Sequence, residues 1–151
     1  MAHIKKVIAV ASGGGHFIQL LRLRPAFEGH QTCFVTTING YQDALGGAPC
    51  FVVRDASRWD KVGLVIMLLQ LIMVFIRVRP DVVITTGAAP GVFAVRLGKL
   101  FRARTLWLDS IANAEEISLS GELAGPYADL WLTQWPELAR ENGPFFKGRV
   151  L

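Results

Sequence analysis

Cysteine is scarce in this sequence, and its arrangement excludes two common kinds of stabilised small domain. The two cysteines, Cys33 and Cys50, are too few for a disulfide framework and form no spacing typical of a zinc site. Cys33 lies in an apolar run, where a buried, unreactive thiol is the simplest interpretation. We therefore expect no metal site. No signal peptide precedes the first apolar run, which favours a cytosolic, reducing environment.

Charge is also sparse, at 19% of residues, whereas apolar residues make up 52%. This is more apolar than an average soluble domain, and the excess favours contact with a membrane or a partner. The net charge of +4 suits anionic head groups, diphosphates or nucleic acid alike. Because the basic residues are scattered and no aromatic–basic platform is present, we expect no nucleic-acid partner.

Two nucleotide-binding motifs are missing from the glycine-rich segment Ser12–His16, which follows the apolar run Ile4–Ala11. No Gly-Lys-Ser/Thr follows the glycines, which excludes a P-loop. Ile18 replaces the third glycine of the dinucleotide fingerprint, and the second strand ends in Thr36 and Thr37 without an acid. Nicotinamide and flavin cofactors are thus not expected. The loop either holds an anion on its backbone or is a tight strand–helix turn without a ligand.

Short β-branched runs alternate with amphipathic or apolar stretches along the chain. The expected strands are 4–11, 32–37, 50–53, 81–85, 105–108 and 128–133, and the expected helices begin at 17, 62 and 92. This order predicts an α/β fold, a Rossmann-like, mostly parallel sheet with helices on both faces. We expect one domain over residues 1–151, since the length leaves no room for a second Rossmann domain. Ligands should bind where the strands end, at 12–16, 85–91 and 109–116.

The stretch Val62–Ile76 carries no charge. As a helix it spans about 22 Å, which is short for a bilayer core of about 30 Å. Basic residues flank it together with a tryptophan, which is typical of an interfacial helix. We predict a membrane-associating helix near 62–78, in contact through Trp59, Leu68, Leu69, Ile72 and Phe75. The alternative is an ordinary core helix packed on the sheet.

A family resemblance is carried by the C-terminal segments Leu108–Ser110, Ile117–Gly121, Ala128–Leu130 and Gln134–Leu138. These segments, the glycine loop and the residues Pro80-Asp81 … Gly87 … Pro90-Gly91 follow one another in the order and spacing of a known family. The chain resembles the membrane-anchor subunit of the two-chain N-acetylglucosaminyltransferase of lipid-linked oligosaccharide synthesis (ALG-type), and its bacterial exopolysaccharide relatives of the PssD type.

This resemblance implies the N-terminal half of a GT-B glycosyltransferase, similar to the acceptor domain of MurG. Such a subunit binds a polyprenyl-diphosphate-linked sugar at the cytoplasmic face of a membrane, as a peripheral or monotopic protein. A separate donor-binding glycosyltransferase subunit supplies most of the UDP-sugar site, and no cofactor is implied. The reaction implied is inverting transfer, with this chain active only together with its partner.

Candidate residues for each role follow from position and resemblance together. For the base we rank His16 first and Asp109 second, and packing or capping remains the alternative for each. The acceptor diphosphate is expected on Ser12, Gly13, Gly14, Gly15, Thr86, Gly87 and Gly91. The partner interface is expected at Trp135, Pro136, Glu137 and Leu138. A non-catalytic membrane scaffold that only recruits the donor-binding subunit is the alternative function. A stand-alone nucleotide-binding enzyme is a weaker one.

Overall fold

The structure is a computed structural model that describes residues 3–150. Within them, seven strands form one sheet in the order β3-β2-β1-β4-β5-β6-β7. The strands are β1 (Lys6–Ala11), β2 (Gln31–Thr36), β3 (Cys50–Val52), β4 (Val82–Gly87), β5 (Arg104–Leu108), β6 (Leu130–Thr133) and β7 (Phe145–Phe146). Every pair of neighbours is parallel. The predicted α/β fold is confirmed, and the sheet is wholly rather than mostly parallel.

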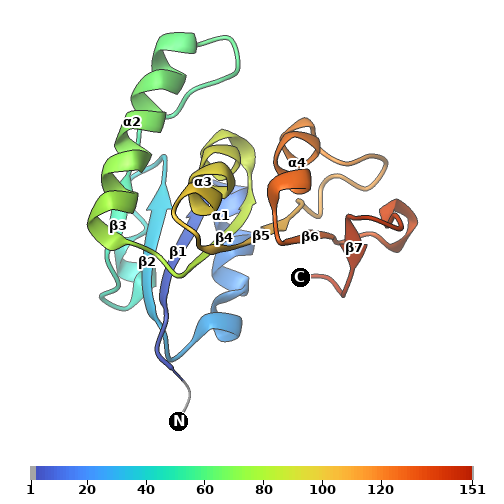
Figure 1. Ribbon diagram of the computed structural model, residues 1–151, viewed down its shortest axis with the longest axis horizontal. Coiled ribbons are helices and arrows are strands. Elements are labelled where there is room, and N and C mark those ends of the chain that lie inside the picture. The colour runs from blue at the N-terminus through green and yellow to red at the C-terminus, as the bar shows by residue number, and fades with distance from the viewer. Residues whose placement is uncertain (1–2, 151) are drawn as a thin grey trace.

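Helices cover both faces of this sheet (Figure 1). They are α1 (Gly15–Arg22), α2 (Lys61–Val78), α3 (Ala88–Leu100) and α4 (Leu119–Ala124), with single 3-10 turns at Arg24–Phe27, Gln42–Leu45, Gly125–Tyr127 and Pro136–Leu138. Residues of α1 pack on one face, and residues of α2 and α3 pack on the other. The helices therefore enclose apolar cores on both faces of the sheet, and a further apolar cluster lies around α3 and α4.

The alternation of side chains in β1 explains why its sequence is apolar without interruption. Val7, Ala9 and Ala11 belong to the core on the α1 side, whereas Ile8 and Val10 belong to the core on the α2 and α3 side. A parallel strand covered by helices on both faces must be apolar at every position. The continuous run over 4–11 thus reflects burial on two sides.

Helix α3 begins at Ala88, four residues before the predicted start at 92. Pro90 falls in its first turn, where the missing N–H has no acceptor within the helix. The 85–91 segment is therefore a strand end followed directly by a helix. Two elements were not predicted at all: α4 and the two-residue strand β7 are too short to produce a periodic pattern.

The strand order reverses direction between β1 and β4. The chain runs outward from β1 through β2 and β3, crosses back to β4, and continues through β5 and β6 on the other side. In open parallel sheets, ligands bind at such a reversal, beyond the carboxyl ends of the strands. The glycine loop after β1 and the Thr86–Gly87 end of β4 both lie at this point.

Candidate functional site

The glycine loop uses two of its own amides to fix its shape. The Gly13 N–H donates to Thr37 Oγ1 at 3.0 Å, and the Gly14 N–H donates to the Tyr41 hydroxyl at 2.8 Å. The Tyr41 ring in turn packs on Phe17, with 4.3 Å between centroids. These two amides therefore have partners and are not the free phosphate donors that the sequence predicted.

The free donors of the loop lie at the start of α1 instead. Gly14 is the N-cap of this helix, with φ 84°, and provides no side-chain cap. The amides of Gly15, His16 and Phe17 occupy the first turn, where a helix has no internal acceptor for its N–H groups. The positive end of the helix dipole adds to the attraction for an anion. Ser12 is half-buried between β1 and these donors.

The His16 imidazole bridges from α1 to the end of β4. Its Nδ1 lies 3.1 Å from the Thr86 carbonyl oxygen. A carbonyl oxygen only accepts, so Nδ1 must carry the proton in this contact, and in the neutral ring Nε2 then holds the free lone pair. Gly87 makes room for the ring, since a Cβ at this residue would lie 2.9 Å from His16 Nδ1.

The end of β4 supports His16 and leaves few hydrogen-bonding groups free for a ligand. The Thr86 hydroxyl is buried and donates to the His16 carbonyl oxygen at 2.5 Å. Gly91 is buried too, and a Cβ there would collide with Thr85 Oγ1. The prediction that the Thr86 hydroxyl and Gly91 hold the diphosphate is therefore wrong for this arrangement. Thr86 fastens α1 to β4, and Gly91 lets α3 approach the sheet.

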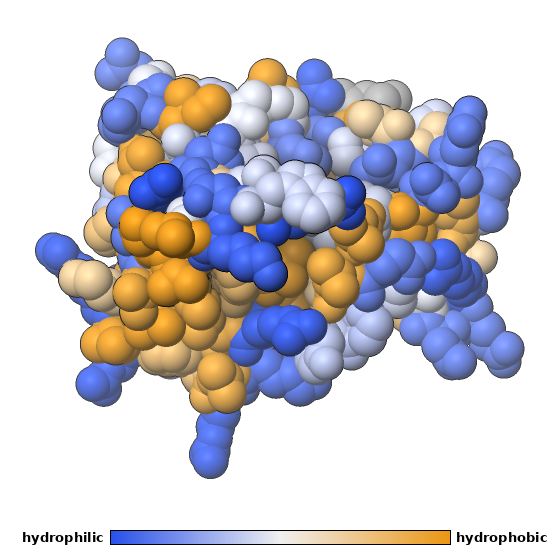
Figure 2. Space-filling model, turned by 90° about the horizontal axis from the view of Figure 1, so that it is seen from above, coloured by the Kyte–Doolittle hydropathy of each residue, from blue (hydrophilic) through white to orange (hydrophobic). Residues whose placement is uncertain are grey.

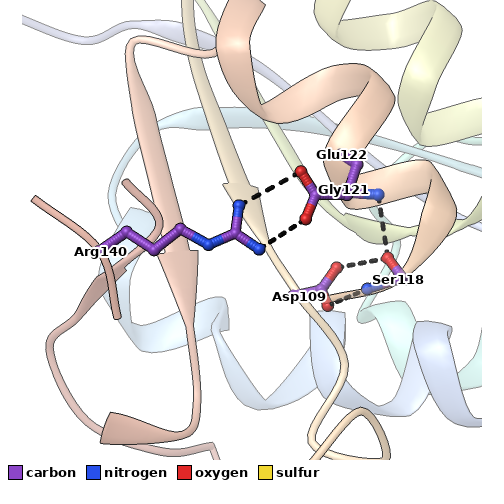
Figure 3. A network of polar contacts seen from close by, with 5 residues as sticks. All are labelled: Asp109, Ser118, Gly121, Glu122 and Arg140. Atoms are coloured by element: carbon purple, nitrogen blue, oxygen red, sulfur yellow. Dashed lines mark hydrogen bonds and ion pairs between the residues drawn. The ribbon is translucent and has the colours of Figure 1, made fainter. Parts of the chain in front are cut away.

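The Asp109 carboxylate is 1% exposed and fully hydrogen-bonded. Trp107 Nε1 and Ser118 Oγ donate to Oδ1 at 3.0 and 2.6 Å, and the Ser118 N–H and Asn113 Nδ2 donate to Oδ2 at 2.9 and 3.4 Å. Figure 3 shows the two bonds to Ser118. These contacts fix the segment 110–118, which follows the carboxyl end of β5. They favour a structural role for Asp109, the second-ranked candidate for the base, over a catalytic one.

Two glutamines that sequence reasoning missed lie in the same region. Gln19 on α1 and Gln134 after β6 are both buried, and Gln134 Nε2 donates to Gln19 Oε1 at 2.6 Å. Gln19 Nε2 also donates to Ser110 Oγ at 3.1 Å. For Gln19 the signal in the sequence was a polar residue beside Phe17 and Leu20 on the apolar face of a short helix. Gln134 belongs to a segment that carries the family resemblance. Neither signal predicts that the two side chains contact each other.

The predicted partner-interface residues divide into two pairs. Trp135 is half-buried, and its Nε1 donates to the Ile111 carbonyl oxygen at 2.8 Å. Leu138 packs against the apolar cluster around α3 and α4. Pro136 and Glu137 are exposed. The indole therefore helps to hold the 110–118 segment, and of the four residues only Pro136 and Glu137 are fully on the surface.

Helix α2 is long and apolar enough to cross a membrane by length and composition, and only 28% of its residues are buried. Its exposed apolar residues recur every three or four positions, which places them on one side of the helix. We call Val62, Val65, Leu69, Met73 and Ile76 the α2 face. Seen from above, apolar side chains gather on the α2 side of the molecule (left in Figure 2).

This face differs in part from the predicted membrane contacts. Trp59 is 78% exposed and Leu69 is also exposed, as expected. Phe75 is fully buried and packs edge-on against Phe101, with 5.5 Å between centroids, so its predicted membrane contact is wrong. Leu68 and Ile72 are half-buried against the core. The sequence of α2 is apolar on almost every side and does not distinguish its buried side from its exposed side. Packing against α3 and the sheet in the structure makes this distinction.

A cavity of about 860 Å³ lies at the other end of the sheet. Lys6 and Gln31, the first residues of β1 and β2, contribute to its wall together with Arg24 and Arg77. The cavity is therefore remote from His16, which lies at the start of α1 beside the carboxyl ends of the strands. Among residues 3–150, no group of three or more His, Cys, Asp or Glu is placed to hold a metal ion.

The family of this chain follows from its sequence. Residues 50–148 match the family described as "Oligosaccharide biosynthesis protein Alg14 like". The UDP-N-acetylglucosamine transferase subunit ALG14 of Eremothecium gossypii is 42% identical over 136 residues, which cover 86% of this chain and 51% of that protein. The Schizosaccharomyces pombe subunit is 35% identical over 65 residues, 40% of this chain and 31% of that protein. The matched segments thus span about half and about a third of the length of these two relatives.

Solved structures share the fold at low identity. MurG of Acinetobacter baumannii superposes with a TM-score of 0.77 at 13% identity, over 95% of this chain and 45% of that one. MnaA of S. aureus, solved with UDP, gives 0.68 at 14% identity, over 87% and 39%. The fold is therefore that of one half of a two-domain GT-B-type protein. By its sequence, the chain belongs to the Alg14-like family of oligosaccharide biosynthesis proteins.

Proposed function

We propose that this chain binds a polyprenyl-diphosphate-linked sugar at a membrane surface. Together with a donor-binding partner subunit, it transfers a sugar from a UDP-sugar to that acceptor with inversion. The observation that carries the proposal is the position of His16. Its imidazole stands at the reversal of strand order, held by the Thr86 carbonyl oxygen at 3.1 Å, beside the open first turn of α1. A base and an anion site thus adjoin each other.

In the proposed step, His16 Nε2 accepts the proton of the acceptor hydroxyl as its oxygen attacks the anomeric carbon. The bond from that carbon to UDP breaks, and UDP leaves with the bonding electrons on the partner's side. The bond from Nδ1 to Thr86 keeps the ring in the tautomer with a free Nε2. The first-turn amides of α1 donate to a phosphate of the lipid.

The position of the α2 face supports a membrane-bound acceptor. Figure 1 shows the N-terminal part of α2 rising past the carboxyl ends of the strands, the same end at which His16 lies. Trp59 and Arg58 precede this part, with the guanidinium 4.6 Å from the ring centroid. Aromatic and basic residues beside an apolar face suit the head-group region of a bilayer. A lipid diphosphate in the crevice would then keep its chain in the membrane.

The names of the relatives and the extent of the matched fold support a partner subunit. The chain corresponds to 45% of the matched MurG structure and 51% of the matched E. gossypii protein. Because the matched relatives are named as subunits of a transferase, we assign the donor-binding half to a separate subunit. UDP-N-acetylglucosamine is the donor to test first, because the curated relatives are named for it.

The test is transfer by the reconstituted pair in detergent, with a polyprenyl-diphosphate-linked N-acetylglucosamine as acceptor. His16→Gln should lower kcat by about 10²- to 10⁴-fold, the range of general-base catalysis. His30→Gln is the matched control, because His30 lies at the amino end of β2, where its Nδ1 accepts from the Lys5 N–H. Near-normal turnover by His16→Gln, with no acceptor binding by this chain, would instead favour the non-catalytic scaffold.

A further inference from the structure

Three buried polar side chains connect α1 to the ends of β5 and β6. Gln19 on α1 is 6% exposed, Ser110 after β5 is 7% exposed and Gln134 after β6 is fully buried. They come from segments far apart in the sequence. None of them belongs to the base, the anion site or the membrane face of the proposed function.

The two glutamine amides are almost fully hydrogen-bonded. Gln134 Nε2 donates to Gln19 Oε1 at 2.6 Å and to the Asp109 carbonyl oxygen at 3.0 Å. Gln19 Oε1 also accepts from the Ile111 N–H at 3.2 Å, and Gln19 Nε2 donates to Ser110 Oγ at 3.1 Å. A buried network in which nearly every group is satisfied favours one arrangement of the segments that it joins.

His16 and Gln19 are three residues apart on α1, so their side chains point to the same side of the helix. His16 contacts the end of β4 through Thr86. Gln19 contacts the segment after β5 and, through Gln134, the segment after β6. The helix that carries the base is thus attached to three consecutive strand ends, and two of these attachments depend on the glutamines.

We propose that Gln19 and Gln134 are positioning residues of the acceptor site. They hold α1, and with it the His16 imidazole, at a fixed place relative to the segment 110–113 that follows β5. This inference rests on the proposed function, because the fixed position of His16 matters for catalysis only if His16 is the base. An error of about 1 Å in the placement of a catalytic group can cost about 10²-fold in rate.

The first experiment measures transfer by the reconstituted pair with Gln19→Leu, Gln134→Leu and the double variant. Leucine keeps most of the buried volume and removes the hydrogen bonds. Each single change should lower kcat at least tenfold per folded molecule and leave KM for the UDP-sugar within twofold. The double variant should lose no more than the worse single one, because the two residues act as a unit. Gln31→Leu, at an exposed position, is the control and should be neutral.

A conservative variant separates positioning from folding. Gln19→Glu keeps acceptors for the Ile111 N–H and for Gln134 Nε2, and the Ser110 hydroxyl can rotate to donate to it. It should therefore recover most of the turnover that Gln19→Leu loses. Equal loss in both variants, or a loss that only follows the folded fraction seen by circular dichroism, would overturn the proposal.

The second experiment does not depend on activity. Nitrogen-15 NMR of the histidine rings, assigned with His16→Gln, reports the tautomer of His16 in the chain in detergent. Wild type should have the proton on Nδ1, and Gln134→Leu should shift the His16 resonances and leave those of His30 unchanged. If the His16 signals do not move, the positioning role is rejected even where transfer fails. If they move in a chain without transferase activity, only the proposed function is at fault.

Discussion

Cys33 and Cys50 lie on opposite faces of the sheet. Cys33 alternates with Phe34 along β2 and shares a cavity wall with Arg77 of α2, whereas Cys50 packs against the core on the α1 side. Burial raises the pKa of both thiols above the usual value of 9.0, and the charge of Arg77 partly offsets this for the Cys33 pKa. Both are unreactive thiols at neutral pH because the thiolate is the nucleophile.

The charge of Arg77 lowers the pKa of Cys33, and this effect can be tested by substitution. Arg77→Gln removes the positive charge, so the pKa of Cys33 should rise further and its alkylation by iodoacetamide at pH 8.5 should slow several-fold. Cys50 is the internal control, since its pKa has no contribution from Arg77. Mass spectrometry of the two peptides gives both rates from one sample. Equal slowing at both cysteines would show a change in packing and contradict the prediction.

The raised pKa values of the two thiols determine how these groups change the stability of the fold as pH rises. Because the folded pKa of each thiol lies above the unfolded one, the unfolded chain loses its thiol protons first as pH rises. The contribution of these groups is complete below the unfolded pKa and is lost as pH rises through the folded pKa.

At the scale of elements, α4 is a six-residue helix with polar contacts at its N-cap and in its first turn (Figure 3). Ser118 is its N-cap and accepts from the Gly121 N–H at 2.9 Å, while its own hydroxyl donates to Asp109. Arg140 pairs with Glu122 at 2.7 Å, but both side chains are about half-exposed, and such pairs stabilise little. A helix this short has little stability of its own, so the buried contacts of Ser118 dominate.

Ser118→Ala should therefore lower the free energy of unfolding by about 1–2 kcal/mol, the typical cost of a lost N-cap. The Asp109 carboxylate would also lose a hydrogen-bond donor while remaining buried. Ser120→Ala is the matched control, because Ser120 lies on the same helix and is not the cap. Urea unfolding followed by tryptophan fluorescence measures both variants. The same midpoint for both would exclude an important role for this cap.

At the scale of the whole molecule, His16 and the first residues of the α2 face lie toward one end of the sheet. The N-terminal part of α2 and the His16 side chain both lie toward the carboxyl ends of the strands. The large cavity lies at the opposite end of the sheet. Under the proposed function, one orientation on a bilayer would bring the α2 face and the His16 end of the sheet to the head groups together.

Binding to vesicles of phosphatidylcholine and phosphatidylglycerol tests this orientation. Val65→Ser, Leu69→Ser and Met73→Ser together should weaken binding at least tenfold, because each fully buried apolar side chain contributes about 1.5–3 kcal/mol. The control changes three exposed leucines elsewhere to serine: Leu100, Leu119 and Leu123. Sedimentation measures the bound fraction. If the control variant loses as much binding as the first, contact is not confined to the α2 face.

Local features of the chain predicted much of this architecture. Apolar runs located all but the shortest strand, and the uncharged stretch located α2, since periodicity and β-branching are properties of neighbouring residues. The glycine loop was correctly placed between a strand and a helix. The donors within it were wrongly assigned, because Thr37 and Tyr41, which bind the Gly13 and Gly14 amides, come from the loop after the next strand.

The sequence by itself determined the α/β class, the family, the position of the glycine loop before α1 and the apolar character of α2. These depend on the order and type of adjacent residues. Only the tertiary structure decided that Asp109 is enclosed by four donors, that Phe75 faces the core and that Gln19 meets Gln134. Each of these depends on which distant segments share an edge of the sheet, and burial and hydrogen-bond geometry exist only once those segments have packed together.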